Sequence, residues 1–134
     1  MALPAVQPKH LTTEEVIVEA HRRAVTTSPA EIAKWMQAVF GRNLTALMSG
    51  VDNPTTITRW TRGTKPHPAH LARLRTAFQI ASLIEIIDDR ETAQAWFMGM
   101  NPILDHHAPA SVLANEPETA HRVMGAAHYF LAHG

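Results

Sequence analysis

The sequence predicts an all-α protein, and three features support that class. Segments that open with a capping residue recur along the 134 residues, and apolar residues three and four apart follow most of them. No run alternates β-branched and polar residues in the manner of a half-exposed strand. Hydrophobic residues make up 46% of the chain and charged residues 18%, which is enough apolar material for a helical core. We therefore expect about seven or eight short helices.

Capping residues predict where the first helices begin. Thr12 and Glu15 have the spacing of a capping box. Ser28 followed by Pro29 has the same role for a second helix, which we expect to end at Gly41. The first helix carries an inward stripe of three residues, Val16, Ala20 and Ala24.

The middle of the chain predicts two short helices and a long one. Asn43 begins the first short helix, Asp52 to Pro54 begin the second, and Gly63 ends it. The longest helix begins at Pro68 and has two apolar stripes, so we expect other helices to cover it on more than one side and the helix to join both halves. The stripes are Leu71, Leu74, Phe78 and Ala81, and Ile80, Leu83, Ile84 and Ile87.

The last third predicts a segment over 90–99, a turn at Asn101-Pro102, a short piece over 109–115 and a final helix from Pro117. Asp88 and Asp89 stand where a helix begins, so helix capping is a better interpretation of this pair than catalysis. The final helix has an inward stripe of Ala120, Val123, Met124, Ala127 and Leu131.

The net charge of zero conceals a division between two halves. Residues 1–75 hold ten Lys/Arg against five Asp/Glu, a balance of +5, and residues 76–134 hold two against seven, a balance of −5. The segment 42–75 has one acid, Asp52, and six basic residues: Arg42, Arg59, Arg62, Lys65, Arg73 and Arg75. This asymmetry indicates two faces with different partners, and the basic face is a candidate for a polyanion.

Several classes of protein and site do not fit. The chain has no cysteine, so a disulfide scaffold and thiol chemistry are excluded. No apolar run has the length of a membrane span, and the N-terminus lacks the apolar core of a signal peptide, so we expect a cytoplasmic protein. The nine histidines do not have zinc-site spacing, so we expect no metal and no cofactor. No nucleophile and base stand at motif spacing, which argues against an enzyme.

Residues 43–63 predict two helices with a tight turn between them. Ala46 allows close approach, and Gly50 provides the turn. Val51 and Ile57 can then fill the angle between the helices. The helical wheel of the second helix turns Trp60 and Thr61 inward along with Ile57. The residues left outward are Thr55, Thr56, Thr58, Arg59 and Arg62.

The outward set suits the major groove of DNA. Threonine is a poor helix former, so propensity alone does not explain three of them on a solvated face. Hydroxyl groups reach bases or phosphates, the threonine methyl meets thymine, and arginine pairs with the two acceptors of guanine. Arg62 and Lys65 in the turn after the helix could hold backbone phosphates. The DNA-binding candidates are Thr55, Thr56, Thr58, Arg59, Arg62 and Lys65.

This helix pair resembles an Xre-type helix-turn-helix. Ala46 matches the small residue of its first helix, Gly50-Val51 the turn, Ile57 the buried position of the recognition helix, and Arg59-Trp60 the end of that helix. Gly50 and Ile57 are seven residues apart, whereas the usual motif has six, so the turn carries one additional residue.

The second half resembles the toxin-binding domain of Xre/MbcA/ParS antitoxins. The resemblance covers residues 31–134 and rests on the order of several weak motifs: Trp96, Asn101-Pro102, Leu104, Ala108-Pro109, Val112-Leu113 and the helix from Pro117. This chain departs from the family at Asp105-His106-His107, where the family often has a glycine. The resemblance implies a helix-turn-helix domain (29–75) and a toxin-binding domain (76–134) joined by a long helix. Residues 1–28 have no clear counterpart in the family, and we expect them to form an N-terminal arm or helix.

The resemblance also implies a function. Members of the family neutralise a RES-domain toxin that degrades NAD, and they repress their own operon by binding its operator DNA. The C-terminal end of such an antitoxin enters the toxin's cleft, which here implies Phe130, Leu131, Ala132, His133 and Gly134 as toxin-binding residues. Operator symmetry implies a homodimer, with a larger toxin–antitoxin hetero-oligomer also possible.

Two other functions remain open from the residues alone. A helix-turn-helix regulator without a toxin would use residues 85–134 for dimerisation or for an effector. A purely protein-binding module, in which the helix-turn-helix has lost its role, would account for the additional turn residue.

Overall fold

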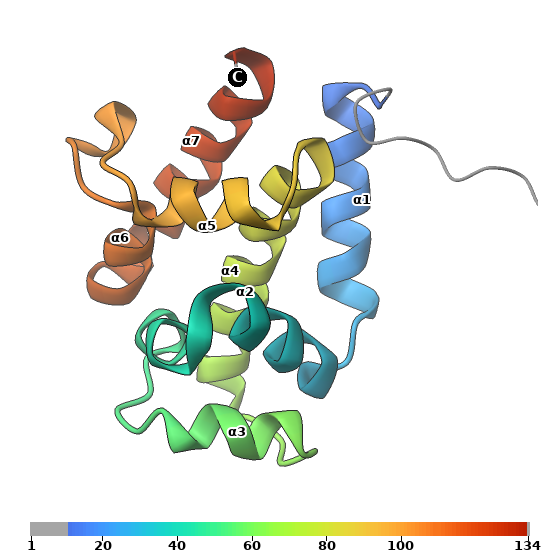
Figure 1. The fold of residues 1–134 in the computed structure, drawn as a ribbon, viewed down its shortest axis with the longest axis vertical. Helices are drawn as coiled ribbons and strands as arrows, with labels where there is room; N and C mark the ends of the chain where they lie inside the picture. Colours follow the sequence, from blue (N-terminus) through green and yellow to red (C-terminus); the bar gives the residue numbers. More distant parts are fainter. Residues whose placement is uncertain (1–10, 134) are drawn as a thin grey trace, which may run out of the picture.

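Helix α4 (Pro68–Ile87) runs through the middle of the molecule, and α1, α2, α5 and α7 pack against it (Figure 1). The computed structural model describes residues 11–133. These residues form helices and no β-strand, which confirms the all-α class. The other α-helices are α1 (Thr13–Thr26), α2 (Pro29–Ser49), α3 (Thr55–Thr61), α5 (Arg90–Met98), α6 (Pro109–Asn115) and α7 (Ala120–His133). Two short 3₁₀ segments, η2 (Pro102–Leu104) and η3 (Pro117–Thr119), flank α6.

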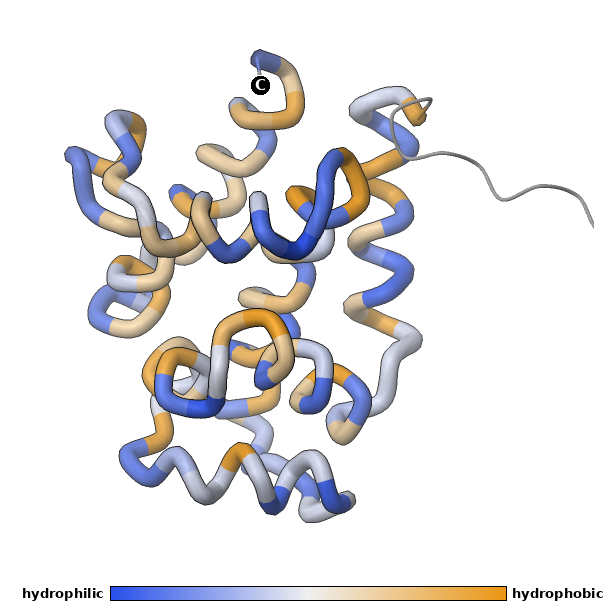
Figure 2. The backbone as a smooth tube through the Cα atoms, in the orientation of Figure 1, coloured by the Kyte–Doolittle hydropathy of each residue, from blue (hydrophilic) through white to orange (hydrophobic). Residues whose placement is uncertain are grey.

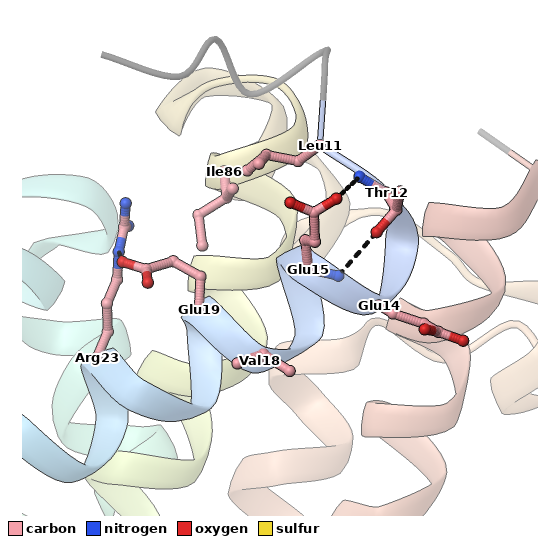
Figure 3. A pocket seen from close by; sticks show the side chains of 8 residues that line it. All are labelled: Leu11, Thr12, Glu14, Glu15, Val18, Glu19, Arg23 and Ile86. Atoms are coloured by element: carbon pink, nitrogen blue, oxygen red, sulfur yellow. Dashed lines mark hydrogen bonds and ion pairs between the residues drawn. The ribbon is translucent and has the colours of Figure 1, made fainter. Parts of the chain in front are cut away.

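Three of the predicted helix caps are present, those of α1, α2 and α5. The hydroxyl of Thr12 accepts a hydrogen bond from the backbone N–H of Glu15 at 3.1 Å, and the Glu15 carboxylate accepts one from the Thr12 N–H at 3.3 Å (Figure 3). Ser28 caps α2 through its hydroxyl. The carboxylate of Asp89 accepts a hydrogen bond from the Thr92 N–H at 2.7 Å, so this acid caps α5, as expected. These side chains satisfy backbone donors that a helix N-terminus leaves free.

Gly41 divides α2 into two helical arms, which agrees with the prediction that one helix ends at Gly41 and another begins just after it. Its φ of 80° and ψ of 160° lie in a region open almost only to glycine, and the helical path resumes after it. The hydroxyl of Thr45 donates to the Gly41 carbonyl at 2.8 Å across the break. The segment from Arg42 to Ser49 is therefore a second helical arm, which begins next to the predicted start at Asn43.

One continuous apolar core joins all seven α-helices. The predicted stripe of α1 is buried and packs on α4, so this helix shares the core of the rest of the chain. The α4 stripes are buried on several sides, as expected of a helix that joins both halves. The fully buried side chains of large volume include Ile32, Met36, Met48, Ile57, Leu74, Ile80, Leu83, Ile84, Phe97 and Leu104.

Helix α3 and the end of α7 lie at opposite ends of the longest axis of the molecule (Figure 1). Helix α3 packs against α2, and Figure 2 shows it as largely pale and hydrophilic, with a hydrophobic segment on the side toward the other helices. The arrangement separates the outward face of α3 from the C-terminal end, so the two surfaces can contact different molecules.

Candidate functional site

The first candidate surface is the outward face of α3. Ile57 is 0% exposed and Trp60 is 3% exposed, so both side chains anchor the helix on the core. Thr55 and Arg59, which alternate with them along the helix, are exposed. The sequence predicted this division between inward and outward residues.

Local hydrogen bonds define both ends of α3. The side-chain oxygen of Asn53 accepts from the Thr55 N–H at 2.9 Å, which positions the first turn. The Arg59 carbonyl accepts from the backbone of Arg62 at 3.1 Å and from Thr64 at 3.1 Å, so the last turn is closed. The chain then turns through Gly63 at a φ of 105°. The exposed side chains therefore project from a helix that is fixed at both ends.

The predicted DNA-binding residues differ in exposure. Thr55, Arg59, Arg62 and Lys65 are exposed, and Thr56 and Thr58 are half-buried. Within residues 11–133, none of the three cations forms an ion pair, so their charges remain available to an external anion. Thr61, predicted inward, is half-buried, and its hydroxyl donates to the Thr58 carbonyl at 2.6 Å.

Two of the six basic residues in 42–75 serve the interior. The Arg73 guanidinium donates to backbone carbonyls at the ends of α2 and α6, at distances between 3.0 and 3.4 Å. The Arg75 guanidinium donates to the carbonyls of Ala24 at 2.6 Å and Thr27 at 2.9 Å, at the end of α1. The residue count therefore overstates the charge of the outer surface. The sequence did contain a signal for the inward role of Arg73 and Arg75, because both lie among the apolar residues Leu71, Leu74 and Phe78 of the longest helix.

The second candidate surface is the C-terminal end, where the resemblance implies toxin contacts. Phe130 and Leu131 are half-buried against the core, and the Phe130 ring lies 6.5 Å from the Trp96 ring, centroid to centroid. Ala132 and His133 are exposed, whereas Gly134 lies outside the described residues. The His133 ring stacks on Tyr129, with centroids 4.0 Å apart.

An apolar groove lies beside these residues. It has a volume of about 270 Å³ and lies between α5, η2 and α7. Its lining residues are Trp96, Asn101, Pro102, Ile103, Ala126, Tyr129 and Phe130. Around it Tyr129 is 53% exposed and Met100, adjacent in sequence to Asn101, is 81% exposed. The sequence interpretation did not include Met100, Ile103 and Tyr129, although Met98, Met100 and Ile103 cluster around a Gly/Asn-Pro turn that displays apolar side chains.

The turn beside the groove has a constrained backbone. Asp105 and His106 adopt the left-handed conformation, with φ values of 54° and 65°, at the position where the family resemblance suggests glycine. Aspartate and histidine tolerate this region better than most residues do. The carboxylate of Asp105 also accepts a hydrogen bond from Arg122 at 3.1 Å, which ties the turn to α7.

A larger groove, of about 800 Å³, follows α1 (Figure 3). Two of its three acidic side chains have partners: Glu15 belongs to the capping box, and Glu19 pairs with Arg22 at 2.6 Å and with Arg23 at 3.4 Å. These bonds to arginine lower the pKa of Glu19. The third acidic side chain, Glu14, is exposed. The groove therefore presents neither a catalytic carboxylate pair nor a metal site.

Between residues 11 and 133, no group of three or more histidine and acidic side chains is placed to hold a metal ion. In the same part of the chain, no helix combines the length and apolar character that crossing a membrane requires.

No protein-family model matches this chain, and neither a curated protein nor a solved structure is significantly similar to it.

Proposed function

We propose that this chain is a DNA-binding antitoxin that represses its own operon and neutralises a RES-domain, NAD-degrading toxin. The observation that carries the DNA-binding part is the orientation of α3. Arg59 and Arg62 project into solvent without ion-pair partners in the described chain, while Ile57 and Trp60 hold the helix on the core. Cations on a rigid element are suited to phosphate and base contacts.

Charge separation supports DNA binding at this end. Six carboxylates of the segment 88–118 are exposed: Asp88, Asp89, Glu91, Asp105, Glu116 and Glu118. These belong to the part of the chain that follows α4, whereas Arg59, Arg62 and Lys65 belong to α3 and the turn after it. DNA approaching α3 therefore meets positive charge first, and repulsion between phosphate and carboxylate stays small.

A protein partner is favoured at the opposite end. The exposed side chains of Ile103 and Tyr129 line an apolar groove, and apolar clusters of this kind are typical of protein-binding surfaces. The proposed toxin contacts are this groove and the C-terminal residues Phe130 to Gly134. In this proposal the chain acts by binding rather than by catalysis, and it forms a homodimer on a symmetric operator.

The DNA-binding part is tested with the region upstream of the chain's own reading frame as a duplex probe. We expect Arg59→Ala to weaken binding by about 1–3 kcal/mol, the cost of one arginine contact to DNA. Arg90→Ala is the matched control, because it removes the same charge from an exposed residue of the other half. Equal affinity of the Arg59 variant and the wild type would refute the assignment of α3.

The toxin part is tested by co-expression with the protein of the neighbouring reading frame. We expect deletion of residues 131–134 to release toxicity and to leave DNA binding intact. A truncated chain that still neutralises would contradict the role of the C-terminal end. If the neighbouring frame encodes no RES-domain protein, the alternative function, a helix-turn-helix regulator without a toxin, replaces the antitoxin.

A further inference from the structure

Arg73 of α4 connects two helix ends that belong to different halves of the chain. Its Nε donates to the Met48 carbonyl at 3.1 Å, near the end of α2. Its Nη2 donates to the carbonyls of Leu113 at 3.0 Å and Ala114 at 3.1 Å, near the end of α6, and it lies 3.4 Å from that of Leu47. No carboxylate of residues 11–133 pairs with this guanidinium.

The chemistry of these contacts explains why the charge is stable there. The last carbonyls of a helix lack partners within the helix and carry the negative end of its dipole. A planar guanidinium with several N–H donors can serve two such ends at once, which a lysine ammonium cannot do in the same geometry. Burial lowers the pKa of Arg73 from its ordinary value, but an arginine remains charged at neutral pH.

The α2 end held by Arg73 leads directly into the turn before α3. Gly50 ends α2 with a φ of 79°, and a Cβ placed on it would lie 2.8 Å from the Arg73 Cζ. On the other side, α6 contacts α5 and α7, which carry the apolar groove. The guanidinium thus contacts the end of α2, which leads to the α3 surface, and the end of α6, which packs on the helices of the apolar groove.

We infer that Arg73 is a positioning residue that sets where α3 lies relative to the C-terminal half, and so couples the two surfaces. Without this side chain, the ends of α2 and α6 lose the hydrogen-bond donor that they share, and the turn that precedes α3 is no longer held in place. The DNA readout below rests on the proposed function, whereas the exchange readout does not.

Arg75 provides a matched control. It is on the same helix and also donates to helix-end carbonyls, those of Ala24 and Thr27 at the end of α1. It contacts neither α2 nor α6 through these bonds. We therefore expect an Arg75 variant to be less stable but to keep the position of α3 relative to the C-terminal half.

The experiment uses four variants of the full chain: Arg73→Lys, Arg73→Gln, Arg75→Lys and Arg75→Gln. Far-UV circular dichroism first checks that each variant is folded. Amide hydrogen exchange is followed in segments 50–63 and 109–116, and affinity is measured for the upstream duplex. We expect both Arg73 variants to speed exchange in both segments and to bind DNA about tenfold more weakly, a loss similar to that of one arginine contact. We expect the Arg75 variants to speed exchange only around residues 24–28.

Three other outcomes would contradict the role of Arg73, its coupling of the two surfaces, or the proposed function. If Arg73 and Arg75 variants change exchange equally in segments 50–63 and 109–116, Arg73 has only a general stabilising role and the inference is wrong. If exchange changes as expected and the wild type binds DNA but the Arg73 variants bind it equally well, the coupling is wrong. If the wild type binds no duplex, the proposed function fails, and the exchange data alone decide whether Arg73 positions α3. Should the glutamine variant not fold, the lysine variant, which keeps the charge, gives the answer.

Discussion

The guanidinium of Arg73 fills the space that a side chain at Gly50 would need. A Cβ on Gly50 would approach the Arg73 Cζ to 2.8 Å, and the Nη1 still more closely. Gly50 also has a φ of 79°, the left-handed region that glycine adopts most readily. The turn before α3 therefore disfavours a side chain for two reasons, backbone conformation and the place of the Arg73 guanidinium.

Replacing Gly50 by alanine should destabilise the protein for both reasons. The left-handed backbone alone costs an L-residue about 1–2 kcal/mol, and displacement of Arg73 adds to this. Gly63→Ala is the control, because its φ of 105° is also positive but no atom lies within 4 Å of the added Cβ. Denaturant unfolding should show a larger loss for Gly50→Ala than for Gly63→Ala. An Arg73→Ala background should reduce the cost at Gly50, and an unchanged cost there would mean that the clash contributes nothing.

The inward side of α3 should control stability, and its outward side should not. Ile57 is fully buried, so Ile57→Ala is expected to cost about 2–5 kcal/mol through lost burial and a cavity. Thr55→Ala, on the exposed side of the same helix, should stay within about 0.5 kcal/mol of the wild type. Urea unfolding of the two variants measures both. Similar losses at both positions would be inconsistent with the orientation of α3.

Helix starts could be predicted from the sequence because each depends on residues that are neighbours in the chain. Thr12, Ser28 and Asp89 all cap the helices they were expected to cap, through bonds to backbone groups three residues away. The burial of Ile57 and Trp60 followed from helical spacing in the same way. Local chemistry decides these features, so one sequence is sufficient for them.

Features that depend on distant contacts could not be predicted in the same way. The role of Arg73 requires Leu113 and Ala114, forty or so positions away, to be placed beside α2. The exposure of Met100 and Tyr129 follows from which side of α5 and α7 the other helices cover, and helical spacing does not fix that side.

Removing the hydroxyl of Ser82 should stabilise the protein. Ser82 is fully buried on α4, and its hydroxyl has no hydrogen-bond partner in the described part of the chain. A buried polar group without a partner costs about 1–3 kcal/mol, so Ser82→Ala is expected to raise the unfolding free energy by about 1 kcal/mol. Thr45→Ala is the contrasting variant, because its buried hydroxyl donates to the Gly41 carbonyl and its loss should destabilise. A lower stability of Ser82→Ala would show that the hydroxyl has a partner after all.

Stability should depend on pH through the cap of α5. The hydrogen bond from the backbone of Thr92 lowers the pKa of Asp89 below its ordinary value of 3.8. A lowered folded-state pKa stabilises the protein above the ordinary pKa, and this stabilisation is lost as the pH falls through the lower value. Asp89→Asn keeps an N-cap acceptor but does not titrate, so its melting temperature should fall less on acidification than that of the wild type. Asp89→Ala should melt lower than both at neutral pH, and parallel acid profiles of wild type and Asp89→Asn would contradict this assignment.

Salt dependence should separate the roles of the cations at α3. Each Lys or Arg that neutralises a phosphate releases counterions, so the slope of log K against log salt concentration changes by about 0.9 per contact. Lys65 lies in the exposed turn after α3, where a phosphate contact is expected, so Lys65→Ala should weaken binding to all duplexes alike and make the slope shallower by about 0.9. Arg59, on the outward face of the helix, should instead alter the preference between duplexes of different sequence. Titrations of the upstream duplex and an unrelated duplex at several salt concentrations measure both effects. An unchanged slope for Lys65→Ala would remove this residue from the interface, and equal weakening of both duplexes by Arg59→Ala would make Arg59 a phosphate contact rather than a base-reading one.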